Sequence, residues 1–234
     1  MTGSGEHCYR LFESFDAELS SSWIQYGVRG TGRIVTQPRG RVAHLEVGPK
    51  ERDEVAKASI IHEFPRPMRV GDVLEVAASF RLPEIRGGRV SLIDIECKYC
   101  GLATQAGIRL FVNPDRTIFL ERAKLGMRSS FPQKARLRLP VDEWFDVRWR
   151  TRFGQGDDGQ CRVWIDETLV IEASGPNFPD RTVASLHGID LIAEQYDRVE
   201  IGLTANSQPR PMTLEMDDIE FLLDYAEGCD AHPL

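Results

Sequence analysis

The chain has 234 residues, a length that sandwiches and barrels fill as one unit, so we expect a single domain over residues 1–234 with a core over about 9–224 and a flexible tail over 225–234. Its 29 basic and 36 acidic residues give a net charge of −7, which argues against a nucleic-acid partner because binding phosphates requires a basic surface. No stretch approaches the roughly 18 apolar residues of a membrane span, so no membrane partner is expected.

The first fifteen residues and the cysteines bear on the compartment. The segment MTGSGEHCYRLFESF has neither an apolar core nor a small-residue cleavage site, so it does not predict a secretory signal. The compartment stays open: cytoplasmic as the sequence is written, exported if a leader precedes it. Five cysteines cannot all pair within the chain. Cys97 and Cys100 form a lone CxxC without the second pair of a zinc site, so structural thiols are expected, with a metal or redox role as the alternative.

Short runs of β-branched and aromatic residues recur along the chain, separated by Gly, Pro and Asp, and no helical period lasts more than about two turns. Regularly spaced strands with turn signals between them predict an all-β fold, a two-sheet antiparallel sandwich of the jelly-roll kind. The expected strands are 33–37, 41–47, 58–64, 73–82, 90–96, 107–112, 117–122, 135–139, 144–153, 160–165, 169–173, 198–204 and 212–221. Two longer connections, 124–134 and 175–197, remain, the second with a helical turn expected near 189–194.

The segment WFDVRWRTRFGQGDDGQCRVWI is the clearest hairpin, because apolar and polar residues alternate on both sides of Asp158-Gly159. Trp164 lies between Val163 and Ile165 and so points away from the core. An exposed Trp is a natural platform for a sugar ring; packing on the sheet is the alternative.

Three segments carry a resemblance: FESFDAELSSSW, DEWFDVRWRTRFGQGDDGQCRVWIDETLVIEASG and RVEIGLTANSQPRPMTLEMDDIEF. They resemble the concanavalin A-like lectin/glucanase superfamily, with LamG-like domains and heparin lyase I-type polysaccharide lyases as the nearest members. The resemblance implies a curved sandwich whose concave sheet binds a glycan, without an organic cofactor. It also implies a structural calcium where the first and last strands pair, held by Glu13 or Asp16 with Asp217 or Asp218. The alternative is that these acids lie on an exposed edge strand.

The strand SLIDIE places Leu92, Asp94 and Glu96 on one face. Retaining glucanases of this superfamily have an EIDIE strand in which the first Glu is the nucleophile and the last is the acid/base. Leu92 stands at the nucleophile position, and a retaining mechanism needs both carboxyls, so a retaining glycosidase is not expected.

A lyase needs a base, usually Tyr or His, and a cationic or amide group that neutralises the uronate carboxylate. The run from Arg109 to Arg150 is rich in basic residues, which could be a cationic groove or solvated strand faces. Our candidate catalytic residues are His44, Tyr99 and Arg109. The candidate substrate-binding residues are Glu46, Asp94, Glu96, Arg122, Lys124 and Trp164.

Three functions remain open. The first is a polysaccharide lyase acting on an acidic glycan. The second is a non-catalytic glycan-binding module, and the third is a structural or protein-interaction sandwich. In the first two, the partner is a polysaccharide or oligosaccharide. The sequence leaves the sugar and the oligomeric state open.

Overall fold

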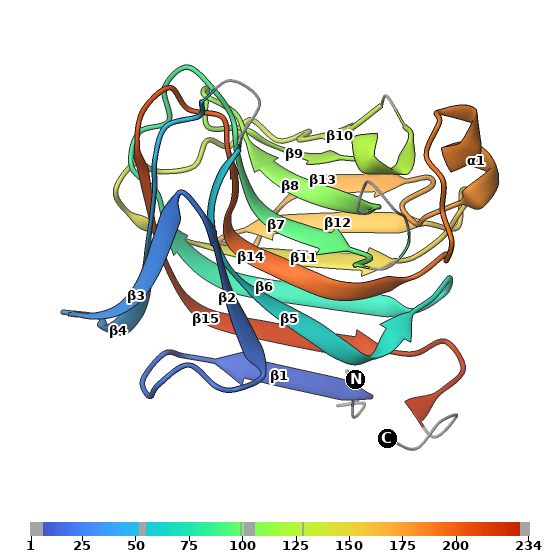
Figure 1. The fold of residues 1–234 in the computed structure, drawn as a ribbon, viewed down its shortest axis with the longest axis horizontal. Helices are drawn as coiled ribbons and strands as arrows, with labels where there is room; N and C mark the ends of the chain where they lie inside the picture. The colour runs from blue at the N-terminus through green and yellow to red at the C-terminus, as the bar shows by residue number, and fades with distance from the viewer. Residues whose placement is uncertain (1–6, 52–54, 99, 101–105, 128, 230–234) are drawn as a thin grey trace.

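Two antiparallel β-sheets packed face to face make up the structure (Figure 1). The computed structural model describes residues 7–51, 55–98, 100, 106–127 and 129–229. Between the sheets lie the side chains expected from the period-two alternation, with Phe80, Trp149 and Phe221 from one sheet and Ile95 and Ile201 from the other, all fully buried. The predicted jelly-roll sandwich is confirmed.

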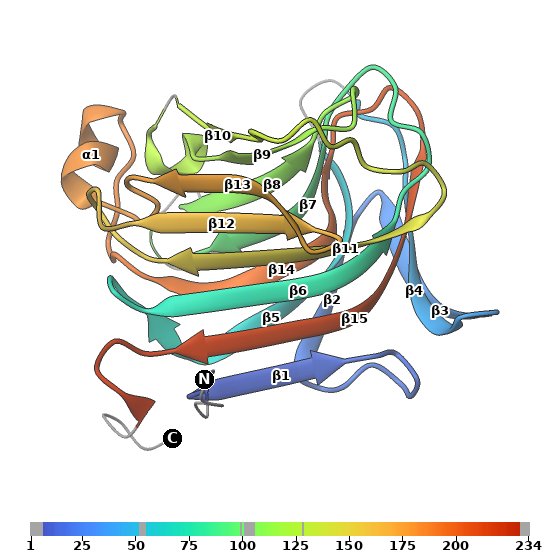
Figure 2. The same ribbon diagram turned by 180° about the vertical axis from the view of Figure 1, so that it is seen from behind.

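Sheet A lies in front in Figure 2. Its hydrogen-bonded order is β13 (Thr168–Ser174), β12 (Gln160–Ile165), β11 (Trp144–Arg152), β6 (Val73–Arg81), β15 (Met212–Asp224), β4 (Gly40–Val47) and β3 (Gly30–Gln37), with β1 (Tyr9–Glu13) also paired to β15.

Sheet B forms the second layer. Its order is β10 (Phe131–Pro132), β9 (Ile118–Glu121), β8 (Gly107–Val112), β7 (Val90–Glu96), β14 (Tyr196–Asn206), β5 (Ala56–Met68) and β2 (Trp23–Val28).

Two short helical segments lie in the connections. The 3₁₀ turn η1 (Ala123–Leu125) follows β9, and α1 (Arg181–Leu186) lies before β14. The side chain of Asp180 caps α1 by accepting from the backbone N–H groups of Thr182 and Val183. None of the described helices is long and apolar enough to cross a bilayer.

Most expected strands are observed, and the differences have local causes. Strands β1, β2 and the two-residue β10 were not expected. Strand β2 has only one buried residue, Trp23, and therefore lacks an alternating pattern. Residues 135–139 do alternate but form no strand, since the backbone of this stretch bonds to Val170 and Arg116 at its two ends. The helical turn expected near 189–194 is instead α1, further toward the N-terminus.

Four of the five cysteines form disulfides. Cys8 is bonded to Cys229 across 221 positions, and Cys97 to Cys100; Cys161 is free and buried. The thiols expected at these four positions are therefore oxidised pairs. Residues 225–229, expected to be a flexible tail, are tied to β1 through Cys229, and Ala226 N donates to Asp72 Oδ1.

Candidate functional site on the outer face of sheet B

The outer face of sheet B, turned away from sheet A, carries a row of charged side chains on neighbouring strands. In β7, Ile93 and Ile95 point into the core, so Asp94 and Glu96 point outward. Asp94 lies directly opposite Arg109 of β8 and Glu200 of β14. Residues directly opposite one another in antiparallel strands share a face, so these charges are brought together by register alone.

Lys124 reaches this row from η1. Its Nζ lies 2.7 Å from Asp94 Oδ2 and 2.5 Å from Glu96 Oε1. The turn is held in place by Leu125, which is buried, and by Gly126, whose positive φ of 80° ends the 3₁₀ segment. The ammonium group is therefore fixed between two carboxylates that are themselves 1% and 0% exposed.

Further ion pairs flank this centre. Arg198 Nε donates to Glu96 Oε2 at 2.9 Å. Glu200 accepts from Ser59 Oγ at 2.6 Å and pairs with Lys57 Nζ at 3.2 Å.

The cluster extends across β8 to β9. Arg109 and Arg89 both pair with Glu121, Arg89 at 2.9 Å. Each guanidinium also lies within 5 Å of the Phe111 ring centroid. This end of the cluster is the more open one, since the Arg89 side chain is 45% exposed.

Burial and charge push the two central carboxyls in opposite directions. Burial, reinforced by the charge on Glu96, raises the pKa of Asp94 well above its usual 3.8, and the charges of Lys124 and Arg109 only partly oppose this. Burial also acts to raise the pKa of Glu96, but Lys124, a hydrogen bond from Asp94 and Arg198 outweigh it and lower the pKa to about 2. Asp94 is thus the member of the pair that holds a proton more readily.

Two buried polar atoms in the cluster have no hydrogen-bond partner among the described residues. They are Asp94 Oδ1 and Arg109 Nε, an acceptor and a donor on residues directly opposite each other. A single hydroxyl group could accept from the guanidinium and donate to the carboxylate.

A hollow of about 370 Å³ lies beside the cluster, lined by Arg89, Phe119, Glu121, Met127 and His187, among others. A side chain at Gly126 would collide with the His187 ring, 2.7 Å from the position of its Cβ, so glycine is needed here for the close approach as well as for the turn. The hollow places a histidine at the rim of the charged face.

The structure brings together only part of the predicted site. Arg109, Asp94, Glu96 and Lys124 meet as described, whereas His44 lies on the other sheet. His44 Nε2 bonds to Glu46, its neighbour on β4, at 2.9 Å. The candidate catalytic residues His44 and Arg109 therefore lie on different sheets, which the sequence could not tell, and their catalytic role stays a prediction.

Of the other predicted residues, Arg122 lines the hollow beside the cluster and anchors the chain after β9. Its Nη1 donates to Pro176 O at 2.7 Å and its guanidinium lies 3.8 Å from the Phe131 ring centroid. Trp164 is on the outer face of sheet A, beside Arg148. Tyr99 lies outside the described residues and stays a prediction.

Among the four acids expected to hold calcium, no three carboxylates lie within metal-binding reach of one another. Asp218 pairs with Arg39 Nη2 at 2.8 Å, and Asp217 lies 3.5 Å from Arg39 Nε. Glu13 accepts from the backbone N–H of Phe15 at 2.9 Å. Arg39 thus supplies positive charge to Asp217 and Asp218, and the charge of Asp16 also acts on Asp217. Calcium at these acids stays a prediction.

One group of three acids among the described residues has the spacing of a metal site, with oxygens within 4.8 Å of one another: Asp94, Glu96 and Glu200. Lys124, Arg198 and Lys57 already provide positive charge to these oxygens. A metal ion would have to displace an ammonium group to bind these oxygens.

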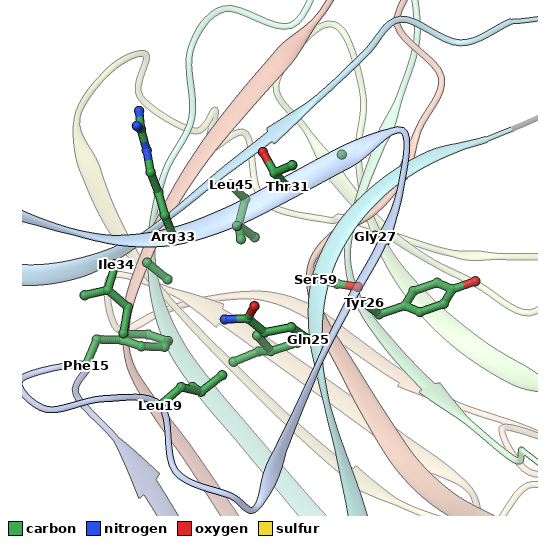
Figure 3. A pocket seen from close by; sticks show the side chains of 14 residues that line it. Phe15, Leu19, Gln25, Tyr26, Gly27, Thr31, Arg33, Ile34, Leu45 and Ser59 are labelled. Carbon is green, nitrogen blue, oxygen red and sulfur yellow. The ribbon is translucent and has the colours of Figure 1, made fainter.

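A different hollow, of about 220 Å³, opens between β2 and β3 at the edge of the core (Figure 3). Phe15, Leu19, Ile34 and Leu45 line it. Its lining contains no acid and no histidine, and its ionisable side chains are Tyr26 and Arg33.

No family model and no curated protein matches the sequence. Several solved structures match the fold. An endo-β-1,4-glucuronan lyase from the fungus Trichoderma reesei is 11% identical with a TM-score of 0.65, covering 91% of this chain and 94% of that one. The cellulose-induced protein Cip1 is 16% identical with a TM-score of 0.63, covering 90% and 96%. The alginate lyase Aly36B is 9% identical with a TM-score of 0.54, covering 91% and 96%.

At these identities the likeness shows the fold alone. The finer resemblance to LamG-like domains and heparin lyase I-type lyases stays a prediction. The chain has the jelly-roll sandwich fold that solved polysaccharide lyases have.

Proposed function

We propose that the chain binds an acidic polysaccharide on the outer face of sheet B and cleaves it by β-elimination. The observation that carries the proposal is the cluster at Lys124, where fixed cations surround a carboxyl with a raised pKa and two unpartnered polar atoms. The fold likeness supports the same class, because two of the matched structures are lyases of glucuronan and alginate, both uronate polymers.

The chemistry of elimination accounts for the cations. A base removes the proton beside the uronate carboxylate, and neutralising that carboxylate stabilises the developing enolate. Lys124 and Arg109 lie on adjacent segments and offer this charge. The unpartnered Asp94 Oδ1 and Arg109 Nε would each bond to a hydroxyl group that reaches them. As the base we propose Tyr99, the tyrosine predicted from the sequence.

Binding without cleavage is the second candidate. It is favoured by the fact that the central cations already pair with the protein's own carboxylates. In addition, no described histidine or tyrosine hydrogen-bonds to Asp94, Glu96 or Lys124. A site of this kind would recognise a glycan without turning it over.

One experiment separates these possibilities. The protein is incubated with glucuronan, alginate, polygalacturonate and heparin, and the ultraviolet absorbance of the unsaturated product is followed beside a binding assay. Absorbance growth that is lost in Lys124→Met and kept in Lys50→Met, a variant of an exposed lysine, supports the lyase. Salt-sensitive binding without absorbance growth supports the binding module. Folded protein that neither binds nor cleaves any of the four polymers contradicts both.

We also propose that the protein works in an oxidising compartment. Disulfides persist outside the reducing cytosol, and here four of five cysteines are paired. A polysaccharide substrate fits the same surroundings. Thiol labelling of protein isolated from its native source, with and without reductant, tests this: one accessible thiol after unfolding without reductant is expected, and five would contradict it.

A further inference from the structure

The outer face of sheet A, opposite the charged cluster, carries a groove of about 670 Å³. Its floor is formed by Ala77 and Ser79 of β6, whose short side chains leave the face low between taller neighbours. On one side stand Arg148 and Trp164, and on the other Phe12 and Glu220. The sandwich core separates this groove from the cluster on sheet B.

Strand register places these residues in one transverse row. Trp164 is opposite Arg148, Arg148 is opposite Ala77, Ala77 is opposite Glu220, and Glu220 is opposite Phe12. The row crosses β12, β11, β6, β15 and β1, so its ends are about 19 Å apart at roughly 4.8 Å per strand. An aromatic ring therefore stands at each end of the row, with the lowest point in the middle.

Both aromatic ends are available at the surface. Phe12 is 55% exposed. Trp164 is partly exposed and stacks with the Arg148 guanidinium, 4.3 Å from the ring centroid, so the two form one broad planar wall. Each end of the groove thus offers an aromatic face on which a sugar ring can stack.

The polar groups of the groove are held in fixed positions by one another. Ser79 Oγ donates to Asp146 Oδ1 at 2.6 Å and accepts from Arg39 Nη2 at 3.1 Å. Arg39 also pairs with Asp218 at 2.8 Å. Such a preorganised set of donors and acceptors suits a ligand rich in hydroxyl groups.

The charges of the lining decide between kinds of ligand. The groove contains two arginines, Arg39 and Arg148, against four acids, Asp146, Glu167, Asp218 and Glu220. The lining therefore has no excess of positive charge to attract an anionic polymer. Asp218 pairs with Arg39 and Glu220 with Arg10, so little free negative charge remains to attract a cationic peptide. A neutral ligand fits best.

We propose that this groove is a second glycan-binding site, specific for a neutral polysaccharide chain. The polysaccharide chain is held by stacking at Trp164 and Phe12 and by hydrogen bonds to Ser79 and its partners Asp146 and Arg39. This site does not depend on the cluster on sheet B. One molecule would thereby hold a neutral polymer on one face and an acidic polymer on the other.

The test is affinity electrophoresis in gels containing mixed-linkage β-glucan, galactomannan or soluble starch, with polygalacturonate and poly-lysine as charged probes. The wild-type protein is expected to be retarded by at least one neutral polymer, equally at low and high salt. Trp164→Ala and Phe12→Ala should each weaken that retardation about tenfold, the loss expected from one aromatic contact. Ala77→Leu, which fills the floor, should abolish it.

Two variants serve as controls. Ile24→Ala removes a 48% exposed apolar side chain from β2 of sheet B and should bind as the wild type does. Lys124→Met should also keep neutral-polymer binding, which separates this site from the one on sheet B. Lys124 is only 21% exposed and its replacement is expected to destabilise the protein, so thermal unfolding of each variant checks that it is folded at the assay temperature.

Three outcomes overturn the proposal. The first is that no neutral polymer retards the wild-type protein. The second is that the groove variants bind as well as Ile24→Ala does. The third is that only poly-lysine binds, with strong salt dependence, which would make the groove a surface for basic peptides.

Discussion

The ammonium group of Lys124 lies 2.7 Å from the carboxylate of Asp94, although the two residues are 30 positions apart in the chain. Asp94 is 1% exposed and has a second carboxylate, Glu96, beside it. The positive charge of Lys124 is therefore needed to keep these two buried acids side by side.

Replacing Lys124 by Met should lower the free energy of unfolding by about 3–5 kcal/mol, the range seen when one partner of a buried ion pair is removed. The charges of Asp94 and Glu96 would otherwise remain buried without their shared counter-ion. Urea denaturation followed by fluorescence measures the change. Lys50→Met, at an exposed lysine, should stay within about 0.5 kcal/mol, and equal losses in the two variants would contradict the structural role of Lys124.

Glu96 should make the protein acid-sensitive over a defined interval. Its pKa is about 2 in the folded protein against an ordinary 4.5, so the unfolded chain binds more protons between these values and stability falls as the pH drops through them. Glu96→Gln should flatten this part of the curve of unfolding free energy against pH. An unchanged slope in the variant would show that the pKa of Glu96 is not lowered in the folded protein.

The titration of Asp94 should change stability with pH in the opposite direction. Because its pKa is raised, the folded protein keeps a proton that the unfolded chain has released above pH 3.8, and stability falls as the pH rises through the folded pKa. Asp94→Asn keeps the shape and removes the titration, so its stability relative to the wild type should increase with pH over that window. The same urea series measures it, and a relative stability that decreases with pH would contradict the prediction.

The two disulfides should differ in their contribution to stability. By the chain-entropy model, a link across 221 positions contributes about 5 kcal/mol and one that closes a four-residue ring about 2 kcal/mol. The double variants Cys8→Ser with Cys229→Ser and Cys97→Ser with Cys100→Ser are compared by urea denaturation. The reverse order would show that local packing around Cys97 outweighs chain entropy.

Gly202 should tolerate no side chain. Its φ is +125°, and a Cβ there would lie 2.6 Å from Leu45 Cδ1 of the facing sheet and 2.9 Å from Ala58 O. Gly202→Ala should cost about 3 kcal/mol or more, from strain and overpacking together. Gly188→Ala is the matched control, since Gly188 also has a positive φ but nothing within 4 Å of its Cβ, and it should cost only about 1 kcal/mol. Equal costs would mean that the clash is relieved.

The sequence predicts which face of its own strand a residue of the charged cluster occupies, but not which strands lie next to one another. Alternation puts Asp94 and Glu96 on one face of β7, and the following basic strands supply Arg109 and Lys124. Arg198 was not predicted, because β14 comes more than 100 positions later and alternation does not say which strand lies beside β7. A search for charged residues at period two in the late strand 198–204 would have found Arg198 and Glu200 together.

The same limit explains why the sequence could not separate His44 from the charged cluster. Its strand and its outward direction follow from the alternation of RVAHLEV, but membership of sheet A follows from pairing with β15, a contact between residues far apart in the chain. Edge strands such as β2 are not predicted for a different reason. With one face and one edge open to solvent, they need few buried residues and so show no alternating pattern.

The bond between Cys8 and Cys229 closes nearly the whole chain into a covalent ring. A protease that cuts one loop between these positions would therefore open the ring without releasing a fragment. The nicked protein would run as a single species on a non-reducing gel and separate into two pieces only after reduction.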